Sequence, residues 1–326
     1  LGKGAEPSLY LGMEIVRTPT EFQLRQTKLI DMLTSKCGNL LSSIPHEKVP
    51  MRDIRLDDTS CPDTPELKAK WKLKPYRSLL GVCGYLMLAT RNDISFAYQR
   101  LARWNDNYGQ DHWDALLRLV KFLEKSKQTH YLSISKFGGW NLSGYCDSDF
   151  NGCPVMHMSS TGWIIFLGWV PISWCSRLQR CVARSTGEAE YLALSSLSQE
   201  AVYLSMFARS LKIPESVFEI YSNESNEHDT NGTDPSAVQI WSDSQVALAQ
   251  AKKPDNWVVD KLRHIKTAYH FFKSYVRNGA LRLLGISGKD NPSDIYTKGW
   301  GAPGKTAANQ KADDFKRHAD FCAGRR

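Results

Sequence analysis

Four acidic residues fall at points where predicted strands and helices begin or end. Asp147 ends a strand, Glu190 lies near the start of a long helix, Asp243 stands where a strand gives way to a helix, and Asp294 opens a short helix. In this order the four carboxylates could converge on one edge of a sheet. Because like charges a few ångströms apart raise one another's pKa, such a cluster needs cations to neutralise it. Two Mg²⁺ ions, or Mn²⁺ in their place, would do so and could activate a water for phosphodiester hydrolysis.

Each carboxylate also has a purely structural interpretation. Asp243 and Asp294 could cap their helices, Glu190 could be a solvated helix residue, and Asp147 could belong to a turn. The ordered set of four is what favours a metal site. Glu188 precedes Glu190 by two residues, so on a helix it points about 200° away and is the poorer ligand.

A second group of residues suggests contact with nucleic acid. Arg177, Arg180 and Arg184, together with Trp174, could form a basic and aromatic strand edge. Such an edge would bind phosphates and stack on bases. A solvated strand face explains the same residues equally well.

Other potential ligands are less specific. Cys146, Cys153 and His157 could suggest zinc, but they have no fourth ligand at finger spacing, so buried or idle thiols are favoured. His264 and His270 lie on one predicted helix. Packing is the preferred role for His270, and both packing and catalysis stay open for His264.

The elements that position these residues follow from the spacing of apolar side chains. Alternation over 9–17 and 22–24 predicts a hairpin, and the segment from 43 to 65, with its four prolines, predicts a connector. Helical spacing, with apolar residues three and four positions apart, is found at 27–36, 76–88, 94–104 and 113–125.

The period changes from helical to alternating near residue 128. Strands are predicted at 131–135, 142–147, 162–168, 172–175, 238–241 and 280–286. Helices are predicted at 186–211, from 243, at 261–277 and from 292. The chain from there on is therefore a mixed α/β layer, with the long helix at 186–211 suited to lie across a sheet.

The composition indicates a folded protein with an anionic partner. A chain of 326 residues with 42% hydrophobic content predicts about two domains with packed cores. Lys and Arg number 42 and Asp and Glu 34, a net charge of +8. Six of the acidic residues lie between 213 and 236, so the rest of the chain has 42 basic against 28 acidic residues, a net +14. Nucleic acid is the partner that this charge suggests.

The cysteines and the apolar runs bear on compartment. The eight cysteines include no Cys-x-x-Cys pair and no apolar leader precedes them, which favours a reducing, intracellular compartment such as a cytoplasmic particle or the nucleus. No apolar run approaches the length that spans a bilayer, so no membrane partner is expected. The first residue is Leu rather than Met, so a fragment or a processed product is expected.

An ordered series of motifs runs from Leu9 to Gly299. The motifs are Leu9-Tyr10-Leu11-Gly12-Met13-Glu14-Ile15, Tyr76-Arg77-Ser78-Leu79-Leu80-Gly81, Asn92-Asp93-Ile94-Ser95-Phe96-Ala97, His112-Trp113-Asp114-Ala115-Leu116, Gly144-Tyr145-Cys146-Asp147-Ser148-Asp149, Ser159-Ser160-Thr161-Gly162, Pro171-Ile172-Ser173-Trp174, Ser185-Thr186-Gly187-Glu188-Ala189-Glu190-Tyr191, Asp243-Ser244-Gln245, Arg263-His264-Ile265 and Ser293-Asp294-Ile295-Tyr296-Thr297-Lys298. With this series the chain resembles the C-terminal part of a copia-type retrotransposon polyprotein: the end of the reverse transcriptase followed by its ribonuclease H domain.

The resemblance implies a fold class and a domain order. It implies an α/β, ribonuclease H-like domain with a mixed five-stranded sheet at 131–300, which carries an acidic insertion at 213–236. A distal reverse transcriptase hairpin, helix and connector at 1–60 and a helical thumb or connection at 61–130 would precede it. Residues 301–326 are expected to form a flexible basic tail.

The resemblance also implies a reaction and its partners. In the ribonuclease H family four carboxylates bind two Mg²⁺ ions and cleave the RNA strand of an RNA/DNA hybrid, and the matching residues here are Asp147, Glu190, Asp243 and Asp294. The hybrid is the implied substrate. The implied protein partner is the upstream reverse transcriptase fingers and palm, or another part of the polyprotein, in a larger complex. The Asp-Asp motif of the polymerase would lie upstream of Leu1, so this chain alone is not expected to polymerise DNA.

The alternative is a catalytically silent module of retrotransposon origin. It would serve as a nucleic-acid-binding or assembly subunit of a larger particle. The altered loop from Cys153 to Met158, where the family has a polar, Arg-containing stretch, favours this alternative, as do the acidic insertion and the truncated start. The four intact carboxylates disfavour it, because a chain freed from catalysis has no physical reason to keep a costly acidic cluster.

Overall fold

The computed structural model describes residues 6–137, 139, 141–153, 155–211, 237–253, 271–300 and 305–325, without the side chains of 305–310. The chain divides into two compact units. Unit 1 is Leu1–Lys136 with Lys298–Arg326, and unit 2 is Phe137–Thr297. None of the helices in the described ranges has both the length and the apolar composition needed to cross a membrane. The predicted acidic insertion, His264 and His270 lie outside the described residues.

Unit 1 contains a four-stranded antiparallel sheet. Its strands, in the order β1-β2-β3-β4, are β1 (Leu9–Tyr10), β2 (Met13–Arg17), β3 (Glu21–Arg25) and β4 (Leu132–Ser135). The predicted hairpin is confirmed. The strand predicted at 131–135 exists, but it pairs with β3, Leu24 opposite Leu132, instead of with the strands that follow it. Alternation of apolar and polar residues along one segment predicts a strand, but it does not identify the strand with which that segment pairs.

The other main elements of unit 1 are helices. They are α1 (Thr27–Cys37), α2 (Pro65–Lys72), α3 (Tyr76–Ala89), α4 (Ser95–Ala102), α5 (Gln110–Ser126) and α10 (Lys305–Cys322). The core forms where the apolar stripe of α5, with Leu116, Leu119 and Leu123 fully buried, faces the buried Leu79 and Leu80 of α3. The apolar spacing did not predict helix α2, because this helix buries no side chain.

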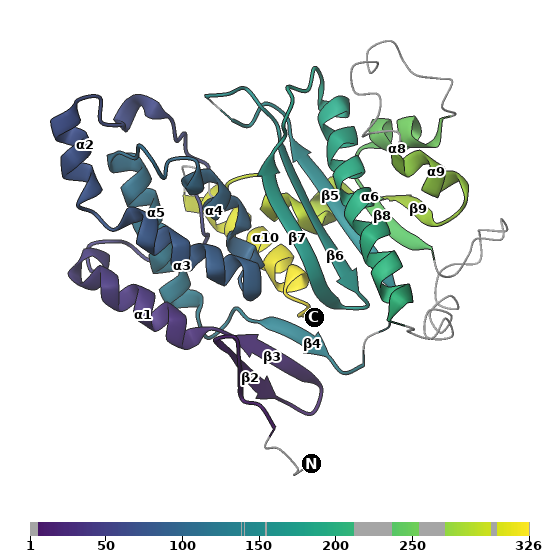
Figure 1. The fold of residues 1–326 in the computed structure, drawn as a ribbon, viewed down its shortest axis with the longest axis horizontal. Coiled ribbons are helices and arrows are strands. Elements are labelled where there is room, and N and C mark those ends of the chain that lie inside the picture. The colour runs from purple at the N-terminus through teal and green to yellow at the C-terminus, as the bar shows by residue number, and fades with distance from the viewer. Residues whose placement is uncertain are drawn as a thin grey trace. The chain divides into compact units, whose positions relative to one another are not determined.

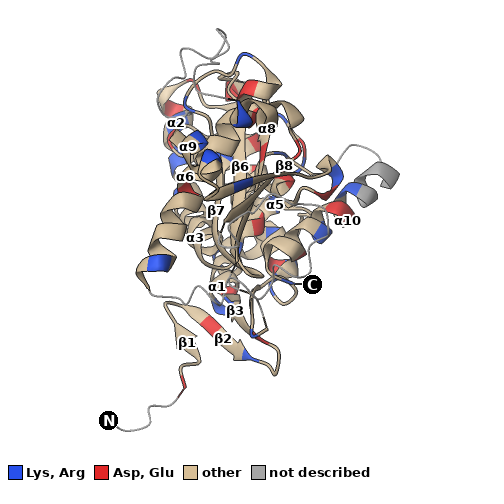
Figure 2. Ribbon diagram, turned by 90° about the vertical axis from the view of Figure 1, so that its right-hand side faces the viewer, with Lys and Arg blue, Asp and Glu red and all other residues tan. Residues whose placement is uncertain are grey.

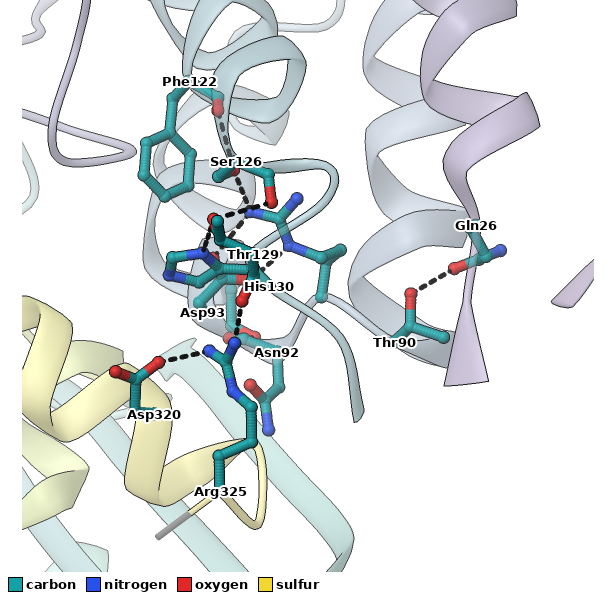
Figure 3. Close-up of polar contacts among 12 residues, drawn as sticks. Gln26, Thr90, Asn92, Asp93, Phe122, Ser126, Thr129, His130, Asp320 and Arg325 are labelled. Atoms are coloured by element: carbon teal, nitrogen blue, oxygen red, sulfur yellow. Dashed lines mark hydrogen bonds and ion pairs between the residues drawn. The ribbon is translucent and has the colours of Figure 1, made fainter. Parts of the chain in front are cut away.

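The prediction of a flexible basic tail is wrong for residues 305–325. Helix α10 packs on unit 1, with the buried ring of Phe315 edge-on to Phe122 at 6.1 Å between centroids. The last turn is held by polar contacts (Figure 3). Arg325 donates to the carbonyl of Thr129 and pairs with Asp320, and the side-chain amide of Asn92 donates to the Cys322 carbonyl at 2.6 Å. Charged and small residues dominate this segment in sequence, and only its few buried residues reveal the packing.

Unit 2 is built on a mixed five-stranded sheet. Its strands are β5 (Leu142–Asp149), β6 (Ser160–Leu167), β7 (Val170–Leu178), β8 (Val238–Ser242) and β9 (Leu281–Gly285). The spatial order is β7-β6-β5-β8-β9. Strand β6 runs antiparallel to both β5 and β7, whereas β8 runs parallel to both β5 and β9. The α/β class and the mixed five-stranded sheet are therefore confirmed.

One long helix and two shorter ones cover this sheet. Helix α6 (Thr186–Ser210) lies across the sheet (Figure 1), and α8 (Gln245–Lys252) and α9 (Phe271–Arg277) pack beside it. Leu194, Leu197 and Ala201 of α6 are fully buried against Ile165 and Ile240 of the strands. The 3-10 segments η5 (Gly288–Asp290) and η6 (Pro292–Tyr296) follow β9. The long helix was predicted to within one residue.

Candidate metal centre

The register of two parallel strands brings two of the predicted carboxylates together. In the ladder between β5 and β8, Cys146 lies opposite Ser242. The residue after Cys146 is Asp147, and the residue after Ser242 is Asp243, so these two residues also lie side by side. Asp147 lies two residues before the end of β5, and Asp243 follows the last residue of β8. Because the strands are parallel, both carboxylates stand at the same edge of the sheet.

Helix α6 supplies the third carboxylate. Gly144 of β5 lies so close to Leu197 of α6 that a Cβ atom added to it would stand 2.8 Å from a Leu197 methyl carbon. From this contact, Asp147 is three residues along the strand and Glu190 is seven residues back along the helix. Both steps cover about 10 Å, at about 3.3 Å per strand residue and about 1.5 Å per helix residue. The two carboxylates consequently reach the same level.

The start of α6 is fixed by a cap. The Ser185 hydroxyl accepts the backbone N–H of Glu188 at 3.2 Å, and a Glu188 carboxylate oxygen accepts the N–H of Arg184 at 3.0 Å. The first bond satisfies an N–H group that the helix start leaves without an intrahelical partner, and the second ties the residue before the N-cap to the first turn. Glu188 therefore serves the cap, and it is absent from the carboxylate group, as the helical spacing predicted. The cap also fixes the level at which Glu190 meets the sheet.

The three carboxylates form a group that could hold a metal ion. Asp147, Glu190 and Asp243 each offer one oxygen, and these oxygens all lie within 4.8 Å of one another. Asp147 is 3% exposed and Glu190 6%, whereas Asp243 is partly exposed. Buried carboxylates at this spacing repel one another strongly unless a cation lies between them. Carboxylate oxygens are the ligands that Mg²⁺ prefers, so the donor set fits the predicted metal.

The pKa of a neighbouring thiol reflects the negative charge of the carboxylate group. Burial raises the pKa of the Cys146 thiol well above its ordinary value, and the neighbouring Glu190 and Asp147 carboxylates raise it further. Cys146 is fully buried beside Asp147, with its thiol directed to the Trp241 carbonyl at 3.7 Å. The thiol is therefore protonated. Among the described residues, Cys146, Cys153 and His157 form no group close enough to hold a metal ion, so the zinc interpretation has no support.

Asp294, the fourth predicted ligand, is not a member of this group. It stands on η6, which lies against β5 and β6. This approach depends on Gly162, which is opposite Asp147 in the ladder between β5 and β6. A Cβ atom at Gly162 would stand 2.6 Å from the Thr297 methyl group and 2.7 Å from the Tyr296 Cβ. The glycine thus lets η6 lie over the strand that carries Asp147.

Two residues of the site were not predicted as functional. The Thr297 hydroxyl donates to Oδ2 of Asp147, and the Asn291 side-chain amide donates to the Cys146 carbonyl at 2.9 Å. Both residues are fully buried and both flank η6. The sequence signal for Asn291 is its place as an N-cap residue before Pro292. Nothing in the local sequence connects Thr297 to a carboxylate 150 positions earlier.

The predicted basic strand edge is divided between two faces and a loop. Arg177 of β7 donates to the Ser196 hydroxyl of α6 at 2.7 Å. Trp174 is three residues away, so it faces the opposite side of the strand. Arg180 and Arg184 are exposed in the segment between β7 and α6. Figure 2 likewise shows Lys and Arg spread over several elements instead of gathered on one strand.

The fold and the site define a class of protein: an α/β protein whose mixed sheet carries a buried, acidic, candidate divalent-metal centre. No family model matches the chain. Three relatives are retrovirus-related Pol polyproteins. The one from transposon TNT 1-94 of Nicotiana tabacum is 31% identical over 88% of this chain and 20% of its own length. Those from transposons RE2 and RE1 of Arabidopsis thaliana are each 29% identical over 89% of this chain and 18% of theirs.

The chain therefore belongs to the retrovirus-related Pol polyproteins of copia-type transposons. The predicted family is thereby confirmed. The chain spans about a fifth of the length of these relatives.

Proposed function

We propose that unit 2 is a ribonuclease H that hydrolyses the RNA strand of an RNA/DNA hybrid with the help of divalent metal ions. The observation that carries the proposal is the group formed by Asp147, Glu190 and Asp243, whose ligand oxygens lie within 4.8 Å of one another. Three separate elements, β5, α6 and the end of β8, converge to build it. Convergence from distant parts of the chain is what a binding site requires and what helix capping alone does not explain.

The sheet supports the same proposal. The resemblance implied a mixed five-stranded sheet with helices, and the apolar spacing predicted a long helix across it; unit 2 has such a sheet with α6 in that place. The acidic group stands where β5 and β8 run side by side and parallel. A ribonuclease H-like fold is therefore the finer assignment that we propose for unit 2. The remaining parts of a Pol polyprotein are the protein partners that we propose.

Some side chains of such a site would bind the metal ions, and others would hold the metal ligands in the correct orientation. Asp147, Glu190 and Asp243 would hold the ions, and Asp294 on η6 is the proposed fourth ligand. When bound, two Mg²⁺ ions would activate the attacking water and stabilise the leaving oxygen. The Thr297 hydroxyl donates to Oδ2 of Asp147 and so keeps this carboxylate in one orientation. A carboxylate that is already held in one orientation loses less conformational entropy when a metal ion binds.

Cleavage of a labelled hybrid tests the proposal. Purified protein should cut the RNA strand in the presence of Mg²⁺ and spare single-stranded RNA. Removal of metal with EDTA should abolish cleavage. Asp147→Asn should abolish it too, because an amide is a far poorer ligand for Mg²⁺ than a carboxylate. Asp313→Asn, which changes an exposed residue of α10, is the matched control and should cleave as the wild type does.

Two further measurements make the result decisive. Thermal melting should show that Asp147→Asn and wild type are equally folded. Wild-type protein that binds the hybrid but shows no metal-dependent cleavage would contradict the enzymatic proposal. That result would support the catalytically silent, nucleic-acid-binding module instead.

A further inference from the structure

Helix α2 of unit 1 buries none of its side chains. It is eight residues long, from Pro65 to Lys72, and Leu67 is 43% exposed. Leu73, which follows the helix, is 86% exposed. Figure 1 shows α2 at the margin of the helices of unit 1. Short helices in proteins normally depend on packing of an apolar face, so α2 must be stabilised in another way.

The ends of α2 provide that stabilisation. At its start the Thr64 hydroxyl accepts the N–H of Leu67, and Pro65 occupies the first helical position. At its end the Tyr108 hydroxyl donates to the carbonyls of Trp71 and Lys74. The Tyr108 ring in turn stacks on the fully buried Tyr76, with 4.1 Å between centroids. The helix is thus anchored at both ends with its surface open.

That open surface is strongly basic. Residues 67–74, Leu-Lys-Ala-Lys-Trp-Lys-Leu-Lys, contain four lysines, and the one acidic residue of α2 is the exposed Glu66 in its first turn. Lys68, Lys70 and Lys72 are exposed, and within the described residues none of the three forms an ion pair. Arg77, by contrast, pairs with Asp106. The helix dipole favours lysines in the last turn, at 70 and 72, but it does not account for Lys68.

The fourth lysine is held against aromatic rings. The Lys74 ammonium lies 4.0 Å from the centroid of Trp71 and 4.9 Å from that of Trp113. Burial lowers the pKa of Lys74, the Asp114 carboxylate raises it, and the nearby Lys70 lowers it. Lys70 and Lys74 therefore repel each other across the end of the helix. An anion bound there would relieve this repulsion.

We propose that Lys68, Lys70 and Lys72 of α2 form a phosphate-binding surface for a nucleic acid duplex. Lys68 and Lys72 are four residues apart and share one side of the helix, whereas Lys70 points about 200° away from Lys68. A helix with cations on opposite sides can meet the phosphates on both sides of a groove. A helix that binds anionic lipid instead separates a basic face from an apolar one, which α2 does not do. The inference rests on the proposed function only in its choice of ligand, since a hybrid is the expected duplex.

Duplex binding measured without cleavage tests the inference. The probes are a fluorescently labelled RNA/DNA hybrid and a DNA duplex of the same sequence, titrated with protein in EDTA at several salt concentrations. The variant is Lys68→Gln, Lys70→Gln and Lys72→Gln together. Its affinity should be lower than that of wild type. The slope of log affinity against log salt should become shallower by about one for each lysine that contacts a phosphate.

A matched control removes the same charge elsewhere in unit 1. Lys28→Gln, Lys36→Gln and Lys125→Gln change three exposed lysines of α1 and α5. Equal melting temperatures would establish that both variants are folded. A weaker and less salt-dependent complex in the α2 variant alone supports the proposal. Equal behaviour of the two variants, or no binding of either duplex by wild type, overturns it.

Two outcomes separate this inference from neighbouring ideas. Binding of phosphatidylserine vesicles that is lost in the α2 variant, with duplex binding unchanged, overturns the proposal in favour of a lipid surface. Weaker duplex binding by the α2 variant supports the inference even if wild type cleaves no hybrid, and the proposed function then fails alone. If wild type cleaves the hybrid but the α2 variant binds as the control does, the inference fails alone.

Discussion

At the scale of single residues, the site depends on three carboxylates that are not equivalent to the fourth. Asp147, Glu190 and Asp243 bring their oxygens within 4.8 Å of one another, and Asp294 stays outside this distance on η6. Charge repulsion within the group of three is therefore strong without a cation. Because Coulomb repulsion falls with distance, a carboxylate outside the group is expected to contribute less to this repulsion. The four residues should consequently differ in how much activity each supports.

Substitution of Asp243 and Asp294 tests this difference. Asp243→Asn should lower the rate of hybrid cleavage by about a thousandfold, which corresponds to about 4 kcal/mol of transition-state stabilisation. Asp294→Asn should lower it by a smaller factor. Metal titration of both variants, followed by calorimetry, should show the larger loss of affinity for Asp243→Asn. An Asp294→Asn variant as inactive as Asp243→Asn would indicate that Asp294 moves into the group when metal binds.

At the scale of elements, helix α10 shows how a polar segment can be part of a core. Its residues are mostly charged or small, yet Phe315, Ala319 and Cys322 are fully buried on unit 1. The N–H of Ser133, on β4, donates to the Ala323 carbonyl at 2.8 Å. Helix α10 and the residue after it are thus joined to α5 and β4 by packing and by a backbone hydrogen bond. Removing the packing should cost stability.

Phe315→Ala provides the measurement. The ring is 1% exposed between Phe122 and Trp300, so its loss leaves a cavity and should lower the free energy of unfolding by about 3–5 kcal/mol. Urea denaturation followed by tryptophan fluorescence would report the change. Lys311→Ala, at an exposed position of the same helix, should change the free energy of unfolding by less than about 0.5 kcal/mol. If this segment were a flexible tail, Phe315→Ala and Lys311→Ala would have the same free energy of unfolding.

The start of α5 makes the stability of unit 1 depend on pH. His112 is fully buried, its ring lies 4.3 Å from that of Trp104, and its Nδ1 accepts the N–H of Gly109 at 3.2 Å. Burial lowers the pKa of His112 to about 4. The folded state therefore keeps the imidazole neutral at pH values where the unfolded chain, with an ordinary pKa of about 6.5, takes up a proton.

The sign of the pH effect follows from this difference. The contribution of His112 to stability is fully present above about pH 6.5 and is lost as the pH drops towards 4, by up to about 1.4 kcal/mol per pH unit. Urea denaturation at several pH values would measure the slope. In His112→Gln the slope should be smaller, with His130, whose pKa burial also lowers to about 4, still contributing. An unchanged slope would show that His112 does not control this dependence.

At the scale of the whole molecule, the excess of positive charge is spread over both units. The net charge is +8, and Arg177, Arg180 and Arg184 of unit 2 lie on a strand and a loop, whereas the lysines of α2 lie in unit 1. Affinity for a duplex should therefore come from several weak phosphate contacts. Contacts of this kind release counterions and do not read the base sequence.

Charge removal at the three arginines tests this distribution. Arg177→Gln, Arg180→Gln and Arg184→Gln together should weaken binding of hybrids of different sequence about equally. Arg177 should contribute less than the two loop residues, because its guanidinium is already engaged with Ser196. Anisotropy titrations of two hybrids with unrelated sequences, at several salt concentrations, would measure it. Discrimination between the two hybrids, or a loss confined to one of them, would contradict phosphate contact.

The sequence by itself determined most of the elements and the candidate ligands. The hairpin at the start, helices α1, α3, α5 and α6, and strands β5 to β9 follow from local periodicity. The positions of Asp147, Glu190 and Asp243 at the ends of predicted elements indicate the carboxylate group. These features depend on residues a few positions apart, so a single sequence contains them. The motifs likewise indicated the polyprotein family that the relatives confirm.

The tertiary structure decided what depends on residues far apart in the chain. It pairs β4 with β3 instead of with β5, packs α10 against α5, leaves Asp294 outside the carboxylate group and directs the Thr297 hydroxyl to Asp147. It also divides Trp174 and Arg177 between the two faces of β7. Each of these depends on which distant surfaces meet. Periodicity along the chain records which side of an element is apolar, and it does not record what that side contacts.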